Sequence, residues 1–244
     1  MHKRRQRDTE GLMLIEGGEE LALALAAGVQ PRTVFFCPEF QRHPSAPLQF
    51  PPETERIEVT RSVFEKLAYR ENPDGWLAVA PAPRRTLADI TLHRTPLVLV
   101  AEAVEKPGNL GAMLRTADAA GVDALIVCDP GTDLTNPNVV RASRGALFTV
   151  PVAQAGNAET LRWLKALNIG VVAATPQASL LYTEADLRGP VAIVVGAEAT
   201  GLSAEWLAAA DLHVRIPMVG KVNSLNVATA AALLVYEAVR QRIR

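Results

Sequence analysis

The chain has 244 residues, of which 49% are hydrophobic and 21% are charged, and its formal net charge is −1. This composition is typical of a globular protein and argues against a disordered or fibrous chain. RNA-binding proteins usually carry a surplus of basic residues, so any RNA-binding surface here must come from local clusters of Lys and Arg. The length allows one large domain or two smaller ones, and we predict two.

Cys37 and Cys128 are the two cysteines, and neither belongs to a CxxC pair. We therefore expect no disulfide framework, no zinc or other metal site, and a cytoplasmic location. The chain has no apolar run of about 18 residues, as a membrane-spanning helix would need, and the basic N-terminus is not followed by the apolar core of a secretion signal. We expect no membrane partner.

Residues 1–80 predict a small α/β domain. Its expected strands are 12–15, 33–37, 57–59 and 76–80. One helix is expected over 19–27, and a second begins at Ser62, where Ser62 and Glu65 have the spacing of a capping box. Residues 38–52 are rich in proline and predict a surface loop. Because the chain begins close to its first strand, we expect no helix ahead of that strand.

Residues 81–96 predict a linker, since the Ala-Pro-Ala-Pro sequence at its start is stiff. From residue 97 to 244, apolar runs alternate with helical patterns, which predicts an α/β domain with a parallel sheet covered on both faces. Its expected strands are 97–101, 124–128, 170–174, 191–195 and 213–216. Its expected helices are 110–120, 137–143, 159–167, 204–210 and 225–242.

Three glycine- and polar-rich segments of this half adjoin its strands and helices: 109–118, 195–202 and 216–228. Binding sites in open α/β sheets lie at the carboxyl ends of strands, so we predict that the three segments share a site. They read NLGAMLRTAD, VGAEATGL and IPMVGKVNSLNVA. In this order they resemble the three-motif signature of the SpoU (TrmH-like) RNA ribose methyltransferases of the SPOUT superfamily.

The resemblance implies a SPOUT fold, in which the C-terminal segment forms a deep trefoil knot, a rare exception to unknotted topology. It implies a homodimer and transfer of a methyl group from S-adenosylmethionine to a ribose 2′-hydroxyl in structured RNA. The N-terminal domain resembles the small substrate-recognition domain of many SpoU enzymes, and this layout favours ribosomal RNA. The alternatives are a transfer RNA methyltransferase, a non-catalytic RNA-binding or ribosome-assembly factor, and an enzyme of small-molecule metabolism.

The resemblance also implies roles for particular residues. Catalytic or target-binding roles fall to Asn109, Arg115, Glu198, Ser224 and Asn226. The methyl donor is expected against Gly196, Ile216 and Leu225. The chain lacks G-x-G-x-x-G after its strands, which argues against a Rossmann nicotinamide enzyme or a Rossmann-type methyltransferase.

Arg115 is the residue for which the chemistry makes the clearest demand. A ribose 2′-hydroxyl is a weak acid and a poor nucleophile, so the site must stabilise the alkoxide that forms during transfer. A cation about 4 Å away supplies about 4 kcal/mol at an effective dielectric constant near 20. A guanidinium group keeps its own proton, so we expect Arg115 to stabilise the alkoxide rather than to act as the base. The alternative is a surface ion pair with Asp118, three residues on.

Structural roles are also open for the other candidates. Asn109 could be the N-cap of the helix that follows it, and Ser224 could cap the last helix, with Asn226 in its first turn. Glu198 could be a solvated acid in an ordinary strand-to-helix turn.

Basic residues predict the RNA contacts. Arg141 and Arg144 are expected to share one helix face, and residues 3–7 and 84–85 add small basic clusters, although each alone is typical of a solvated surface. Small residues form one face of the last helix: Ala228, Ala231 and Ala232. That face would permit close packing in a dimer or against the chain's own sheet.

Overall fold

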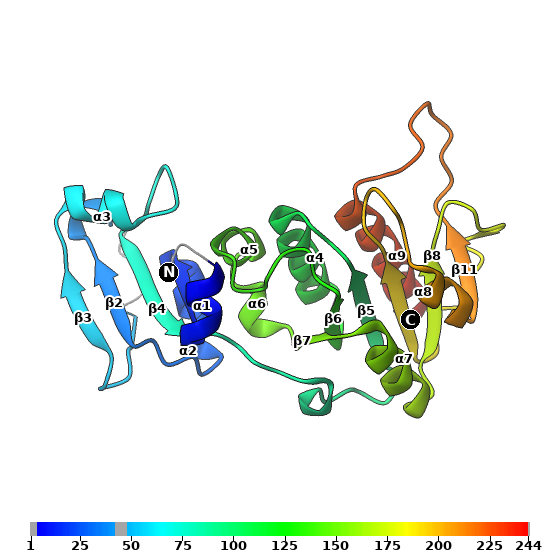
Figure 1. Cartoon of the computed structure of the whole chain (residues 1–244), viewed down its shortest axis with the longest axis horizontal. Helices are drawn as coiled ribbons and strands as arrows, with labels where there is room; N and C mark the ends of the chain where they lie inside the picture. The colour runs from blue at the N-terminus through cyan, green and yellow to red at the C-terminus, as the bar shows by residue number, and fades with distance from the viewer. Residues whose placement is uncertain (1–3, 42–47, 244) are drawn as a thin grey trace. The chain divides into compact units, whose positions relative to one another are not determined.

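The computed structural model describes residues 4–41 and 48–243 (Figure 1). The chain forms two compact units. Unit 1 comprises Met1–Pro83 and Asp133–Thr149, and unit 2 comprises Arg84–Thr132 and Val150–Arg244. The segment Asp133–Thr149 thus packs with the N-terminal part of the chain, although in sequence it lies inside the predicted catalytic domain. The domain boundaries expected from the sequence stay a prediction.

Unit 1 contains a four-stranded sheet in the order β1-β4-β2-β3. Its strands are β1 (Leu12–Glu16), β2 (Thr33–Phe36), β3 (Glu55–Glu58) and β4 (Trp76–Pro81). Its helices are α1 (Arg4–Glu10), α2 (Gly18–Ala26), η1 (Pro38–Phe40), α3 (Arg61–Leu67), α5 (Pro137–Ser143) and α6 (Ala146–Thr149). β4 is antiparallel to β1 and β2, and β2 is parallel to β3. A buried apolar cluster that includes Phe40, Phe64 and Leu77 forms its core.

Specific contacts hold the segment Asp133–Thr149 within unit 1. Helix α5 packs on β1, and α6 packs on α2. Arg7 Nη2 lies 3.0 Å from Asp133 Oδ2, and their side chains are only 3% and 11% exposed. Gly145 has φ of +89°, and a Cβ there would overlap the side chain of Leu23. A glycine is therefore needed where the chain turns from α5 into α6.

Two expectations for unit 1 are wrong. Helix α1 precedes β1, so the first strand does have a helix ahead of it. Helix α3 begins at Arg61 with Thr60 as its N-cap, because the Thr60 carbonyl accepts from the N–H of Phe64 at 2.9 Å. Ser62 therefore lies inside the helix and forms no capping box, and Glu65 accepts from Arg61 Nε instead.

Unit 2 is built on a seven-stranded sheet in the order β7-β6-β5-β10-β8-β11-β9, in which every pairing is parallel. Its strands are β5 (Leu97–Glu102), β6 (Ala124–Cys128), β7 (Val152–Ala155), β8 (Gly170–Ala174), β9 (Leu180–Leu181), β10 (Val191–Val195) and β11 (Leu212–Arg215). β5, β6 and β10 are buried along their whole length. Central parallel strands read as continuous apolar runs for this reason. The short strands β7 and β9 were not expected from the sequence.

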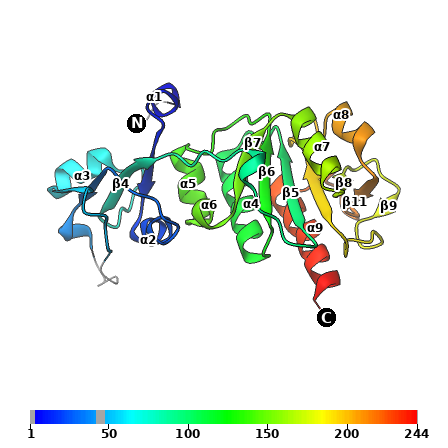
Figure 2. The ribbon, with the colours of Figure 1, turned by 90° about the horizontal axis from the view of Figure 1, so that it is seen from below.

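The helices of unit 2 lie on both faces of this sheet. They are η2 (Leu87–Asp89), α4 (Pro107–Ala119), α7 (Asn157–Ala166), α8 (Ala204–Ala209) and α9 (Val227–Arg242). α4 and α9 pack together on one face, and α7 and α8 pack together on the other, as Figure 2 shows. The predicted α/β fold with a parallel sheet is confirmed. Within residues 4–41 and 48–243, no helix is both long and apolar enough to cross a membrane.

Candidate active site

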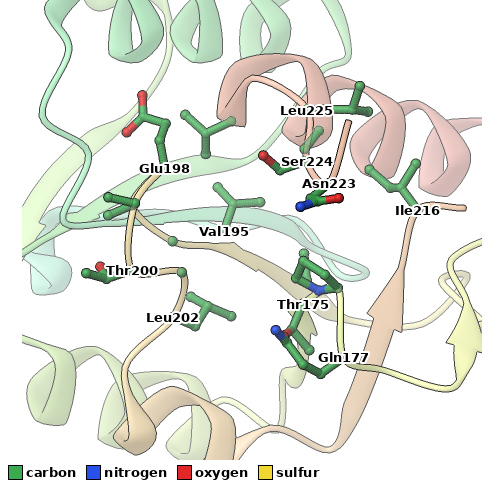
Figure 3. Close-up of a pocket in the computed structure, with 18 of the residues that line it drawn as sticks. Thr175, Gln177, Val195, Glu198, Thr200, Leu202, Ile216, Asn223, Ser224 and Leu225 are labelled. Carbon is green, nitrogen blue, oxygen red and sulfur yellow. The ribbon is translucent and has the colours of Figure 1, made fainter. Parts of the chain in front are cut away.

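A cavity of about 440 Å³ lies in unit 2 at the carboxyl ends of β8, β10 and β11 (Figure 3). Three loops line it: residues 174–177 after β8, 195–202 after β10, and the loop that joins β11 to α9. Two of the three signature segments therefore meet at one edge of the sheet, where loops of parallel strands form binding sites.

The loop after β10 is folded tightly on itself. Ala197 and Gly201 form an isolated bridge, and the Gly201 N–H donates to the Ala197 carbonyl at 2.9 Å. A Cβ on Gly196 would overlap the main chain of Gly201 and Leu202. Gly196 lines the cavity, and only glycine fits the loop at this point, while its contact with the methyl donor stays a prediction.

Side chains from all three signature segments are joined by hydrogen bonds. Asn226 Oδ1 accepts from the N–H of Ala228 at 3.0 Å and of Thr229 at 3.4 Å. Asn226 Nδ2 donates to Asn109 Oδ1 at 2.9 Å, and Asn109 Nδ2 donates to Glu198 Oε1. A main-chain N–H can only donate, so Asn226 must turn its Oδ1 toward helix α9 and its Nδ2 toward Asn109. Asn109 then accepts through Oδ1 and donates through Nδ2. Glu198 is the acceptor of this last hydrogen bond.

This geometry corrects two structural alternatives. The N-cap of α4 is Lys106, so Asn109 lies in the first turn of the helix and does not cap it. The N-cap of α9 is Asn226, so Ser224 does not cap the last helix, which begins at Val227 rather than at Leu225. Ser and Asn are equally good N-caps, and the sequence therefore did not distinguish these two positions.

The predicted donor-binding residues lie around the cavity. Ile216, Ser224 and Leu225 line it, and Figure 3 places Glu198 on the side of the cavity away from Ile216. Thr175 and Gln177 also line it and were missed by the sequence analysis. The signal was available, since these residues directly follow the apolar strand 170–174.

Arg115 is exposed on α4 and does not line the cavity. It lies six residues beyond Asn109 on the same helix. The fold therefore joins Asn109, Glu198 and Asn226 through hydrogen bonds, while the role of Arg115 remains a prediction.

We expected Arg141 and Arg144 to share one helix face, and this expectation is wrong. Helix α5 ends at Ser143, and Arg144 is its C-cap in the left-handed conformation, with φ of +50°. Arg144 Nη2 pairs with Glu19 Oε2 at 2.9 Å, and both side chains are exposed. Both arginines nevertheless line one open pocket of unit 1 with Arg70. Lys3, part of the expected cluster 3–7, lies outside the described residues.

Both cysteines are buried free thiols. Burial raises the pKa of the Cys128 thiol to about 12, although the hydrogen bond between this thiol and the Thr160 hydroxyl acts in the opposite direction. A thiol of this kind is protonated and unreactive at neutral pH. Among the described residues, no group of three or more His, Cys, Asp or Glu side chains could hold a metal ion.

Comparison with known families agrees with this geometry. A family model described as the SpoU rRNA methylase family matches residues 96–236. The chain belongs to the SpoU rRNA methylase family. A second model, the MRM3-like substrate binding domain, matches residues 1–78. The family assignment and the methyltransferase class predicted from the three segments are confirmed.

Relatives and solved structures of SpoU proteins match most of the chain. The 23S rRNA (guanosine-2′-O-)-methyltransferase RlmB of Vibrio parahaemolyticus is 39% identical over 192 residues, which cover 76% of this chain and 78% of that protein. A crystal structure of an RNA 2′-O ribose methyltransferase is 45% identical, with a TM-score of 0.84, over 98% of this chain and 92% of that one. The SpoU methyltransferase AviRb of Streptomyces viridochromogenes, solved in complex with the cofactor AdoMet, is 30% identical, with a TM-score of 0.87, over 98% and 94% of the two chains.

Proposed function

We propose that this chain transfers a methyl group from S-adenosylmethionine to a ribose 2′-hydroxyl of ribosomal RNA. The observation that carries the proposal is the hydrogen-bonded row Asn226, Asn109 and Glu198, which joins the three signature segments beside a cavity. Glu198 also lines the cavity, and a scaffold without activity would not require this hydrogen-bonded arrangement of three polar side chains.

The cavity has the properties that the donor needs. Its volume of about 440 Å³ lies in the range of small-molecule sites, roughly 300–1,000 Å³. Ile216, Leu225 and Val195 supply apolar walls, and the close turn at Gly196 allows a flat ring to approach the main chain. S-adenosylmethionine, when bound, supplies a methyl group on a positively charged sulfur.

The chain's own residues then act on the acceptor. Glu198 and Asn109 lie where a ribose hydroxyl can exchange hydrogen bonds with them, and Ser224 adds a hydroxyl on the cavity wall. Arg115 is an exposed cation on the same helix as Asn109 and stabilises the developing alkoxide while keeping its own proton. The proton leaves to water, a phosphate or another side chain. Holding oxygen and methyl carbon in line supplies a large part of the rate gain, about 7–11 kcal/mol in favourable cases.

The C-terminal segment forms a trefoil knot in this proposal. The meeting of three loops, after β8, β10 and β11, around a single cavity supports it.

The protein also forms a homodimer in this proposal. Ala228 and Ala231 are buried within the chain itself, where α9 packs on α4 and β10. These two residues therefore do not face a second subunit. Leu233 and Tyr236 are 38% and 48% exposed on the same helix and offer an apolar strip to a second subunit. Sedimentation would measure the mass in solution, and a monomer at micromolar concentration would refute a stable dimer.

Ribosomal RNA is the substrate that the matches favour. Three observations support this choice: the family description, the 23S rRNA relative, and the N-terminal match to a substrate-binding domain. In unit 1, Arg141 and Arg144 supply basic contacts for the RNA in spite of their different backbone conformations. The cytoplasmic location stays a prediction.

The test is a map of 2′-O-methyl marks in total RNA from cells with and without the gene. We expect one ribosomal mark to disappear and to return with the wild-type gene, but not with an Asn109→Asp variant. A mark lost from transfer RNA would favour the transfer RNA alternative. If no mark changes and calorimetry shows no donor binding, the chain is a non-catalytic RNA-binding factor.

A further inference from the structure

The end of strand β5 holds both ends of the loop that lines the cavity, residues 196–202. Val195, the last residue of β10, pairs with Ala101 of β5. At the other end of the loop, the main-chain N–H of Ser203 donates to Glu102 Oε2 at 2.8 Å. Ala101 and Glu102 are consecutive, so a single short piece of β5 fixes where the loop begins and where it ends. Figure 3 shows Glu198, Thr200 and Leu202 along this loop.

The Glu102 carboxylate is buried in an unusual environment. Its residue is only 4% exposed, and no ion pair to it is found within the described part of the chain. Its two oxygens accept from uncharged donors: the N–H of Ser203, and Asn157 Nδ2 at 2.7 Å. Burying a carboxylate without a cation is costly, so a neutral residue here would serve stability alone at least as well.

The pattern of donors explains why a carboxylate is needed. Trp206 Nε1, in the fully buried indole of α8, donates to Asn157 Oδ1 at 2.8 Å. An indole N–H and a main-chain N–H can only donate. Asn157 must therefore present Oδ1 to Trp206 and Nδ2 to Glu102, while Ser203 also donates to Glu102. The side chain at this position has to accept through two different atoms, which a glutamine cannot do.

We propose that Glu102 is a positioning residue for methyl-donor binding. Its carboxylate holds the N–H of Ser203 and thereby keeps residues 196–202 in the shape that lines the cavity. Glu102 does not itself line the cavity and acts only through the loop. This inference rests on the proposed function, since it takes the loop to contact the donor.

The experiment compares the full-length wild type with Glu102→Gln and with the double variant Glu102→Gln plus Asn157→Asp. In the single variant, one donor faces the glutamine NH₂ group. In the double variant, the introduced glutamine accepts from Ser203 and donates to the introduced aspartate, whose other oxygen accepts from Trp206. The double variant therefore restores every hydrogen bond, with the wild-type net charge and nearly the same volume. Glu105→Gln, at an exposed carboxylate three residues on, is the control for loss of one charge.

Two readouts are measured: the Kd for S-adenosylmethionine by calorimetry, and amide hydrogen exchange of residues 196–203 in the donor-free protein. We expect Glu102→Gln to raise the Kd by about tenfold and to speed exchange in the loop, because a hydrogen bond to a buried charged group is lost. The double variant should return both values to within about threefold of wild type, and Glu105→Gln should leave both unchanged. A purely structural role would lower the melting temperature without changing the Kd measured well below it.

Wild-type Kd and loop exchange in Glu102→Gln would overturn the proposal, and so would a folded double variant that binds the donor no better than the single one. If Glu102→Gln does not fold, a folded double variant with wild-type affinity supports the proposal, and one that fails to bind overturns it. If the wild type itself binds no donor, the proposed function fails, and loop exchange in the donor-free variants still decides whether Glu102 positions the loop.

Discussion

Asn226 both begins helix α9 and orients Asn109 on helix α4. Its Oδ1 accepts from two main-chain N–H groups at the start of α9, which leaves its Nδ2 to donate to Asn109 Oδ1 at 2.9 Å. The helix cap and the contact with Asn109 are therefore made by the two ends of one side-chain amide. The cap fixes which way the amide points, and the amide then determines that Asn109 presents a donor to Glu198.

Asn109→Asp tests this chain of hydrogen bonds. The substitution preserves shape but puts a carboxylate oxygen where Nδ2 donates to Glu198, so two like charges face each other. We expect kcat/KM to fall by about tenfold or more, and the melting temperature to change little because the site is accessible to solvent. Steady-state methylation of an RNA substrate measures the first quantity and calorimetry the second.

The matched control is Asn109→Asp combined with Glu198→Gln. The NH₂ group of the introduced glutamine then donates to the introduced aspartate, which still accepts from Asn226. Activity closer to wild type than that of Asn109→Asp alone is expected. Equal loss in both variants would show that the negative charge of Glu198 matters more than the direction of the hydrogen bond.

Arg115→Lys tests the role proposed for the exposed cation of α4. Lysine keeps the positive charge but not the planar, bidentate donor geometry of a guanidinium. We expect kcat to fall by about tenfold while the Kd for RNA stays within about twofold, as single-turnover kinetics and filter binding would measure. Near-normal turnover with unchanged RNA affinity would remove the guanidinium from the mechanism.

Sequence patterns located the parallel sheet and its edge because both depend on local signals. Long apolar runs mark the buried strands, and glycine-rich segments directly after them mark the loops. The pairing of Asn109 with Asn226, 117 positions apart, needed the fold, since nothing local distinguishes a capping Asn from one that also reaches a second helix. The expected helix 137–143 matches α5, but the shared helix face of Arg141 and Arg144 was wrong for a similar reason: Arg144 lies outside the helix where Gly145 packs against Leu23, a contact between distant segments.

Glu102 shows a signal that was present but not used. A single acidic residue ends the otherwise apolar strand 97–102 and is buried with it. The sequence does not show which hydrogen-bond donors this carboxylate meets. Those donors come from Ser203 and Asn157, on two other elements. The two-residue strand β9 is the opposite case, because it exists only through its pairing with β11.

Arg7→Met tests the attachment of the segment Asp133–Thr149 to the N-terminal part of unit 1. The substitution leaves Asp133 buried without its closest cation, 3.0 Å away, and breaking a buried pair costs about 3–5 kcal/mol. Arg4→Gln is the matched control, because Arg4 is 56% exposed and its Nε lies 3.7 Å from the same carboxylate. Exposed pairs contribute about 0–1 kcal/mol.

We expect hydrogen exchange in α5 to accelerate strongly in Arg7→Met and little in Arg4→Gln, with a lower melting temperature only in the former. Equal and small effects in the two variants would show that packing of α5 on β1, rather than the buried ion pair, holds the segment in place.

Glu16 gives unit 1 a defined dependence on pH. Burial raises the pKa of its carboxyl above the ordinary value of 4.5, although hydrogen bonds from the N–H groups of Tyr69 and Arg70 act in the opposite direction. The folded protein therefore binds the proton more tightly than the unfolded chain does. The stability that this group contributes is complete below about pH 4.5 and is lost as the pH rises through the raised pKa.

Glu16→Gln removes the titrating carboxyl group but keeps one side-chain oxygen that can accept from the N–H groups of Tyr69 and Arg70. The difference in unfolding free energy, wild type minus Glu16→Gln, should fall as the pH rises above 4.5, by about 1.4 kcal/mol for each unit by which the pKa is raised. Urea denaturation at several pH values between 4.5 and 7 measures it, with Glu71→Gln, at an exposed carboxylate next to Arg70, as the control for loss of one charge. A difference that rises with pH would mean that the two N–H groups outweigh burial and that the sign of the shift is reversed.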